Sequence, residues 1–120
     1  MAEEGVMIVI HLPIRTVSEA NIREHWRVKC KRSKLQRETA RLAMYPYKRS
    51  MHLLPKIRVT LTRIGMRKLD DDNLARSMKA IRDGIADAIG IDDGSAKYVW
   101  QYAQERGEPG EYAVRVTICV

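Results

Sequence analysis

The feature that most constrains the fold is the spacing of apolar residues, which changes its period along the chain. Residues 57–62 alternate between apolar and polar, the period of a strand with one buried face. Residues 74–89 instead carry apolar side chains at helical spacing, and Gly90 supplies a typical helix stop. Alternation returns in residues 98–102 and 112–120. The second half is therefore predicted to form a strand, a helix and two further strands.

The first half predicts one strand and one long helix. Residues 6–12 form an almost continuous apolar run, which is typical of a buried strand. Ser18 is a suitable N-cap, and residues 19–43 contain neither Gly nor Pro, so a helix is expected there. Within it Val28, Leu35 and Leu42 recur every seven positions. Residues 45–55 are expected to be an irregular loop.

The predicted order is β-α-β-α-β-β. Because a turn at residues 107–110 separates the last two strands, they are expected to pair as a hairpin. This order predicts an α+β fold: a single two-layer domain over residues 1–120, with helices on one face of a mixed sheet.

The distribution of charge suggests a polyanionic partner. The net charge is +7, but residues 1–69 carry 16 Lys and Arg against 5 Asp and Glu, whereas residues 70–120 carry 6 against 10. Such asymmetry favours nucleic acid as a partner, the alternative being a solvated basic face.

The basic side chains expected to contact DNA phosphates are Arg23, Arg27, Lys29, Lys31, Arg32 and Lys34 on the predicted helix, and Arg67 and Lys68 farther along. Phosphate contacts carry no base information, which suits a protein that recognises the shape of its DNA.

Cysteine usage and hydropathy bear on location. Cys30 and Cys119 have neither metal-ligand spacing nor the pattern of a disulfide framework, and they are expected to be reduced thiols. No apolar run approaches a membrane span, and the N-terminus lacks a signal pattern. We therefore expect a cytoplasmic protein that does not bind a membrane.

An acidic cluster, Asp70-Asp71-Asp72, stands at the start of the second predicted helix, and Asp92-Asp93 follows that helix. One interpretation is structural, because carboxylates at a helix start cap free N–H groups and complement the dipole. The other is a metal site, because adjacent carboxylates repel one another unless a cation such as Mg²⁺ neutralises them. Both interpretations stay open on the residues alone.

The sequence Asp70-Asp71-Asp72-Asn73-Leu74, with basic Arg76 and the later Asp92-Asp93 pair, resembles the RusA-type Holliday-junction resolvases. The resemblance implies a homodimeric, Mg²⁺-dependent endonuclease of bacterial or prophage DNA recombination and repair, with Mn²⁺ able to substitute. It places Asp70, Asp72 and Asp93 on the catalytic metal-binding aspartates, with Asp71 and Asp92 as secondary candidates. Arg76 stands where the family commonly has lysine, and a guanidinium does not deprotonate near neutral pH.

A continuous helix over residues 73–89 would separate the two acidic groups by about 25 Å, at about 1.5 Å per residue. This length favours a composite site, with Asp70 and Asp72 from one subunit and Asp93 from its partner. The competing interpretation makes Asp92 and Asp93 a simple turn after the helix.

The sequence thus predicts a structure-selective endonuclease that resolves four-way DNA junctions with metal-activated water. The first alternative is a non-catalytic basic DNA-binding protein whose aspartates cap a helix. The second is a metal-dependent phosphatase of small phosphoesters, which leaves the basic first half unexplained.

Overall fold

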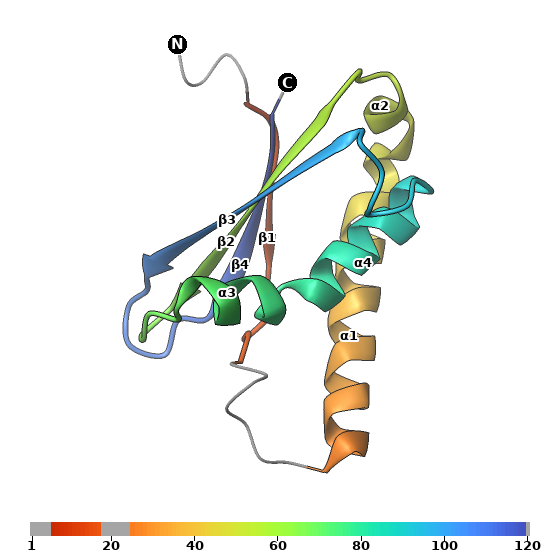
Figure 1. Ribbon diagram of the computed structural model, residues 1–120. Coiled ribbons are helices and arrows are strands. Elements are labelled where there is room, and N and C mark those ends of the chain that lie inside the picture. Colours follow the sequence, from red (N-terminus) through yellow and green to blue (C-terminus); the bar gives the residue numbers. More distant parts are fainter. Residues whose placement is uncertain (1–5, 18–24, 120) are drawn as a thin grey trace.

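The computed structural model describes residues 6–17 and 25–119, which form two layers (Figure 1). The helices lie on one face of a mixed four-stranded sheet, so the predicted α+β fold class is confirmed. The elements are β1 (Val6–Leu12), α1 (Trp26–Met44), the 3₁₀ turn η2 (Tyr45–Tyr47), α2 (Lys48–His52), β2 (Ile57–Gly65), α3 (Asp71–Ser77), α4 (Lys79–Ile89), β3 (Tyr98–Arg106) and β4 (Ala113–Cys119).

The strand order is β1-β4-β2-β3, which shows that the predicted hairpin of the last two strands is wrong. β4 pairs antiparallel with both β1 and β2, while β3 runs parallel to β2 at the edge. The chain between β3 and β4 crosses the end of β2, where the Gly107 N–H donates to the Gly65 carbonyl at 3.0 Å. A Cβ on Gly107 would lie 2.9 Å from Ile64 Cγ2, so glycine permits this crossing.

The core lies between the helices and the inner face of the sheet. It holds the inward residues of the two central strands, the apolar side of α4, and methionines from α1, α2 and the α3–α4 junction. Its fully buried members include Ile57, Val59, Leu61, Val114, Val116, Ile118, Ile81, Ile85, Ile89, Met44, Met51 and Met78. Burying an aliphatic side chain of this size contributes about 1.5–3 kcal/mol, so this layer supplies the main driving force for folding.

α1 begins later than the sequence pattern predicts. His25 is extended (φ −62°, ψ 139°), and its Nδ1 accepts a hydrogen bond from the Arg27 N–H at 3.1 Å. This N-cap makes Trp26 the first helical residue, whereas the predicted cap, Ser18, lies outside the described residues. The buried side of α1 consists of Gln36, Ala40 and Met44. The stripe at seven-residue spacing is instead exposed, at 49% for Val28, 69% for Leu35 and 59% for Leu42.

The expected loop over residues 45–55 contains η2 and α2, so that prediction is wrong. Pro46 stands in the first turn of η2, where its missing N–H leaves no bond unmade. Met51 of α2 is fully buried, and the His52 ring forms a hydrogen bond with the Ile89 carbonyl at the end of α4. These contacts hold α2 against α4.

α1 and α4 cross in direct backbone contact. A Cβ on Gly84 of α4 would lie 2.2 Å from the Arg37 carbonyl oxygen and 2.9 Å from the Ala40 Cβ of α1. The missing side chain therefore sets the distance between the two helices. Along the chain that the structure describes, no helix is both long and apolar enough to cross a membrane.

Candidate functional site

The helix predicted over residues 73–89 is interrupted at Met78, so the continuous helix is wrong. The Ser77 hydroxyl donates to the Leu74 carbonyl at 2.7 Å, which occupies the oxygen that the Met78 N–H would use in an α-helix. The Met78 N–H bonds instead to the Ala75 carbonyl at 3.2 Å, closing a tighter turn. α3 ends there, and α4 leaves in a new direction (Figure 1).

The segment after α4 returns along that helix. Gly90 adopts φ +80°, the left-handed conformation that glycine reaches without steric cost. Asp93 Oδ2 then accepts hydrogen bonds from Lys79 Nζ at 3.1 Å and Arg82 Nε at 2.9 Å. Because Lys79 is the first residue of α4, Asp93 lies beside the start of that helix. The break shortens the path between the two acidic groups, but within the described residues Asp70, Asp72 and Asp93 do not come together in one site, so the composite site stays a prediction.

Asp93 belongs to a packed network with aromatic side chains. The Arg82 guanidinium lies 4.8 Å from the Trp100 ring centroid and donates to the Tyr102 hydroxyl at 3.1 Å. The Trp100 indole N–H donates to the Asp93 carbonyl at 2.9 Å. The hydrogen bond from Lys79, with the charge of Arg82, lowers the pKa of the Asp93 carboxyl. Asp93 is thus ionised at neutral pH and already has two cationic partners.

Asp92 lies in a turn. Its Oδ2 accepts from the Gly94 N–H at 3.0 Å, and its carbonyl accepts from the Ser95 N–H at 3.0 Å. Both bonds are the local side-chain and backbone bonds typical of Asp in turns, as the turn interpretation predicted.

The three aspartates at the start of α3 have different surroundings. Asp70 is the N-cap: its Oδ1 accepts from the Asn73 N–H at 2.9 Å, and its Oδ2 accepts from Asn73 Nδ2 at 3.1 Å. The capping interpretation therefore describes Asp70. Asp71 and Asp72 occupy the exposed first turn, and neither carboxylate bonds to any side chain or N–H within residues 6–17 and 25–119.

The positions of these aspartates decide how they could bind a metal. Within the described chain, no group of three or more His, Cys, Asp or Glu side chains is placed to hold a metal ion. Asp70, Asp72 and Asp93 thus do not form one three-carboxylate site. Mg²⁺ is, however, commonly held by one or two carboxylates together with water and substrate phosphates. The exposed Asp72 and its neighbours fit that simpler arrangement.

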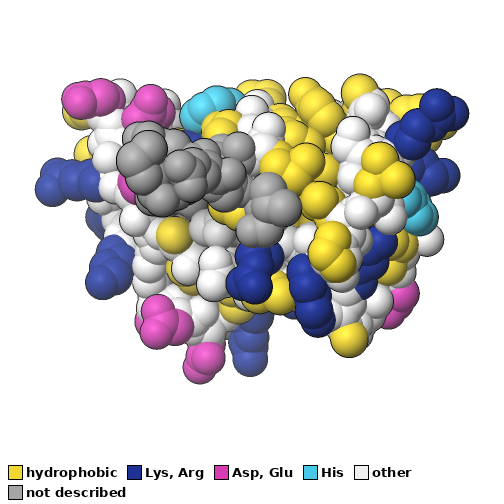
Figure 2. All heavy atoms as spheres, turned by 90° about the horizontal axis from the view of Figure 1, so that it is seen from above, with side chains coloured by type: hydrophobic (Ala, Val, Ile, Leu, Met, Phe, Trp, Pro, Cys, Tyr) yellow, Lys and Arg dark blue, Asp and Glu magenta, His cyan; other side chains and the backbone are white. Residues whose placement is uncertain are grey.

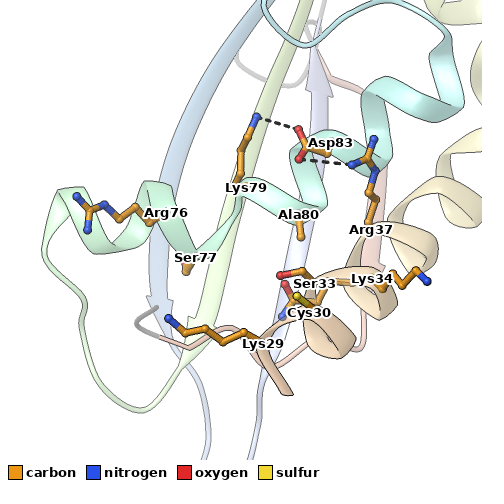
Figure 3. Close-up of a pocket in the computed structure, with 11 residues that line it drawn as sticks. Lys29, Cys30, Ser33, Lys34, Arg37, Arg76, Ser77, Lys79, Ala80 and Asp83 are labelled. Carbon is orange, nitrogen blue, oxygen red and sulfur yellow. Dashed lines mark hydrogen bonds and ion pairs between the residues drawn. The ribbon is translucent and has the colours of Figure 1, made fainter. Parts of the chain in front are cut away.

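A cleft of about 530 Å³ lies between α1 and the α3–α4 junction; we call it the helix cleft (Figure 3). The side chains between the helices are small there, which leaves the space of the cleft open: Cys30, Ser33, Ser77 and Ala80. The edges carry the cations Lys29, Lys34, Arg37, Arg76 and Lys79, against one lining carboxylate, Asp83. The cleft therefore has an excess of positive charge.

Two of these cations are held by carboxylates of α4. Arg37 Nε lies 2.6 Å from Asp87 Oδ2, and Lys79 Nζ lies 2.9 Å from Asp83 Oδ1. The Asp87 hydrogen bond raises the pKa of Arg37, and the Asp83 hydrogen bond is the main cause of the raised pKa of Lys79. Lys34 and Arg76 form no ion pair with the described residues, so their charges are available to a ligand.

A second cleft, of about 580 Å³, lies where β2 and β3 end; we call it the strand-end cleft. It contains two predicted DNA-binding residues, Arg67 and Lys68, together with Arg63 and Arg106. Gln104 of β3 holds the loop after β2, since it accepts from the Leu69 N–H at 2.9 Å and donates to the Leu69 carbonyl at 2.7 Å.

The predicted DNA-binding residues are thus divided between two clefts and an exposed helix face. Lys29 and Lys34 line the helix cleft, whereas Arg27 and Lys31 are exposed on α1 and Arg32 is half-buried there. Arg23 lies outside the described residues. The sequence pattern did not indicate three cations that line the clefts: Lys79, Arg63 and Arg106. A signal existed for Arg63, because it continues the inward-facing phase of Ile57, Val59 and Leu61.

Comparisons with protein-family models, curated proteins and solved structures give no significant match to this chain.

Proposed function

We propose that this protein is a RusA-like endonuclease that binds branched double-stranded DNA and hydrolyses its phosphodiester bonds in recombination and repair. The observation that supports this most is the helix cleft, where Lys34 and Arg76 from two different helices have no carboxylate partner among the described residues. Figure 3 shows their charged groups directed away from each other, so each would neutralise a separate phosphate of a backbone that spans the cleft. Arg76 also lies one helical turn after Asp72, so a phosphate bound there would come close to the acidic turn.

Asp72, with Asp70 or Asp71 beside it, would hold a Mg²⁺ ion that the phosphate also contacts. When bound, Mg²⁺ or Mn²⁺ supplies an activated water and neutralises charge on the phosphate oxygens. Arg76 remains protonated, so its part is to orient the phosphate and stabilise its charge. Asp93, held by Lys79 and Arg82, would position Lys79 at the edge of the helix cleft.

The homodimer that this function requires has a candidate interface on α1. Val28, Leu35 and Leu42 are exposed at seven-residue spacing, which supplies one of the two apolar positions of a coiled-coil heptad. A second copy of α1 running antiparallel through Leu35 would place Leu35 against Leu35 and Val28 near Leu42 of the other copy. Figure 2 shows further hydrophobic side chains on the end of the molecule where α1 meets α2, and Tyr45 and Leu53 are exposed in that region.

The rival function is DNA binding without cleavage. Two contacts favour it: Asp70 is occupied as a helix cap, and Asp93 is occupied by two cations. In that case the protein would bind a junction equally well with and without Mg²⁺ and would leave it intact.

The test is incubation with a labelled four-way junction and a linear duplex of the same sequence, with and without Mg²⁺. We expect Mg²⁺-dependent cutting of the junction, and Asp72→Asn should abolish cutting while binding persists or strengthens. Undiminished cutting by Asp72→Asn would remove Asp72 from the mechanism, and an intact junction under all conditions would favour the rival function.

The same junction tests the helix cleft. The double variant Lys34→Ala/Arg76→Ala should weaken binding and reduce the slope of log affinity against log salt by about 0.9 for each phosphate that is no longer neutralised. Arg58→Ala is the matched control, because Arg58 is exposed and alternates with the inward residues of β2. An equal slope for native protein and double variant would place the DNA elsewhere.

A further inference from the structure

Arg63 is a buried arginine at the end of β2. Only 7% of the residue is exposed, because it continues the inward-facing phase of the strand. Its Nε donates to the Thr16 hydroxyl at 3.0 Å, and its Nη1 donates to the Arg67 carbonyl at 2.5 Å. These two bonds use two of the five N–H groups of the guanidinium.

The surroundings hold the guanidinium without neutralising it. A Cβ on Gly65 would lie 3.0–3.2 Å from the Nη1, Cζ and Nη2 atoms of Arg63, so the guanidinium packs against that glycine. No carboxylate lies within ion-pair distance of Arg63 in the part of the chain that the structure describes. Burial lowers the pKa of Arg63; nearby Tyr112 opposes this shift, and the charge of Arg15 adds to it. A buried charge that has no counter-ion among the described residues is costly, so an anion bound at this position would be stabilising.

The strand-end cleft gives that anion access. Its lining includes Arg63, Arg67, Lys68 and Arg106, against the carboxylates Asp71 and Glu105. Glu105 is neutralised by Arg115, whose Nη2 lies 2.6 Å from Glu105 Oε2. Asp71 belongs to the acidic turn that begins α3, so the cleft adjoins the proposed reaction site.

We propose that the strand-end cleft binds one phosphate of the DNA backbone, with Arg63 as its buried counter-ion and Arg67 and Arg106 at its edge. The proposal rests on the proposed function, because DNA is its ligand. A phosphate is tetrahedral and accepts several hydrogen bonds, which suits guanidinium groups that donate in a planar fork. A DNA strand whose phosphates are bound both here and at Arg76 would run past the aspartates of the acidic turn. The distance between the two bound phosphates would then determine which DNA shapes fit.

The proposal is tested by replacing Arg67 and Arg106. Both line the cleft, and their side chains take no part in the two hydrogen bonds of Arg63. Affinity for a fluorescent four-way junction is measured by anisotropy across a range of KCl concentrations, without Mg²⁺. Arg67→Ala/Arg106→Ala should reduce the slope of log affinity against log salt by about 0.9, the value for one phosphate. Arg58→Ala should leave the slope unchanged.

A direct measurement examines Arg63 itself. Inorganic phosphate, compared with chloride at equal ionic strength, should raise the melting temperature of the native protein more than that of Arg63→Met. If Arg63→Met does not fold, Arg67→Ala/Arg106→Ala replaces it in this comparison. Equal stabilisation of native protein and variant would overturn the proposal.

The outcomes separate this proposal from the one on which it rests. A slope unchanged by Arg67→Ala/Arg106→Ala but reduced by Lys34→Ala/Arg76→Ala would overturn the strand-end site and leave the proposed function standing. Equal losses in Arg58→Ala and Arg67→Ala/Arg106→Ala would also overturn it, because the effect would then be one of net charge. Failure of the native protein to bind any junction would overturn both.

Discussion

Replacing Asp93 by asparagine separates a structural role from a catalytic one. The variant keeps the size and one oxygen acceptor but removes the charge that faces Lys79 and Arg82. The side chains of Asp93 and Arg82 are 21% and 26% exposed, and a hydrogen bond of this kind to a charged group contributes about 1.5–3 kcal/mol. Lys79 is 61% exposed, so its pair adds only a few tenths of a kcal/mol. Because asparagine still accepts a weaker bond, we expect a loss of about 1–2 kcal/mol.

The loss should depend on pH in a defined direction. The pKa of Asp93 is lowered in the folded protein below its ordinary value of 3.8. The stability that the ionised carboxylate contributes is therefore fully present above the unfolded-state pKa and disappears as pH falls through the lower folded-state pKa. Native protein and Asp93→Asn should therefore differ equally at pH 7 and pH 5, and the difference should begin to shrink only below about pH 4.

Urea or thermal unfolding of both proteins at pH 7, 5 and 3.5 measures this difference. A loss of 1 kcal/mol corresponds to a decrease of about 4 °C in melting temperature for a chain of this size. Asp92→Asn is the control, because its exposed turn bond to the Gly94 N–H can be made by asparagine too. A loss for Asp93→Asn that is equal at all three pH values would refute the reasoning. An inactive variant as stable as the native protein would instead make Asp93 a metal ligand.

Three further predictions concern packing and assembly. Gly84→Ala should destabilise the protein by about 3 kcal/mol, despite its better helix propensity, because its Cβ would overlap the Arg37 carbonyl; an unchanged melting temperature would contradict this. Leu35→Glu should yield a monomer by sedimentation at concentrations where the native chain is a dimer, and an undiminished mass would place the interface elsewhere. If neither homodimer cuts, mixed Asp72→Asn and Asp93→Asn subunits should regain nicking after exchange, as the composite site predicts, whereas no recovery after demonstrated exchange would place both acidic groups of a site in one chain.

Local pattern predicted the local elements well. The apolar run over residues 6–12 coincides with β1, the alternation from residue 57 begins at the first residue of β2, and Gly90 ends α4. Each of these signals depends on neighbours in the chain, such as the side-chain period of a strand or the positive φ that glycine permits. The fold class followed from them.

The pairing of the strands could not be predicted from the local sequence pattern, because it depends on which strands lie at the centre of the sheet. A turn between two alternating segments indicates a hairpin, but β2 lies between β3 and β4. The relevant difference is burial: Val114, Val116 and Ile118 are buried in a central strand, whereas most of β3 is only half-buried or exposed at the edge. The residues of the turn at 107–110 indicate that the chain reverses direction. They do not indicate that it crosses the end of β2 before the next strand begins.

The break between α3 and α4 could not be predicted from the sequence, because the apolar residues keep their helical spacing across it. Leu74 and Met78 are four residues apart and both are buried, although α3 ends between them. Both helices turn their apolar side toward the same core, so the spacing continues across the junction. The Ser77 hydroxyl that takes the Leu74 carbonyl is a short-range effect that serine shows in many helices without breaking them. Asp93 could therefore not be placed beside Lys79 from the sequence.

The structure also shows that not every basic residue of the first half is available to bind DNA. Part of the basic first half pairs with the acidic second half: Arg37 of α1 binds Asp87 and approaches Asp83 of α4. These pairs help to join α1 to α4 and are not available to DNA. The cations left without carboxylate partners among the described residues include Lys34 and Arg76 at the helix cleft and Arg63 at the strand-end cleft. If DNA binding depends on these positions, its salt dependence should reflect a few phosphates at two clefts, well below the count of basic residues in the first half.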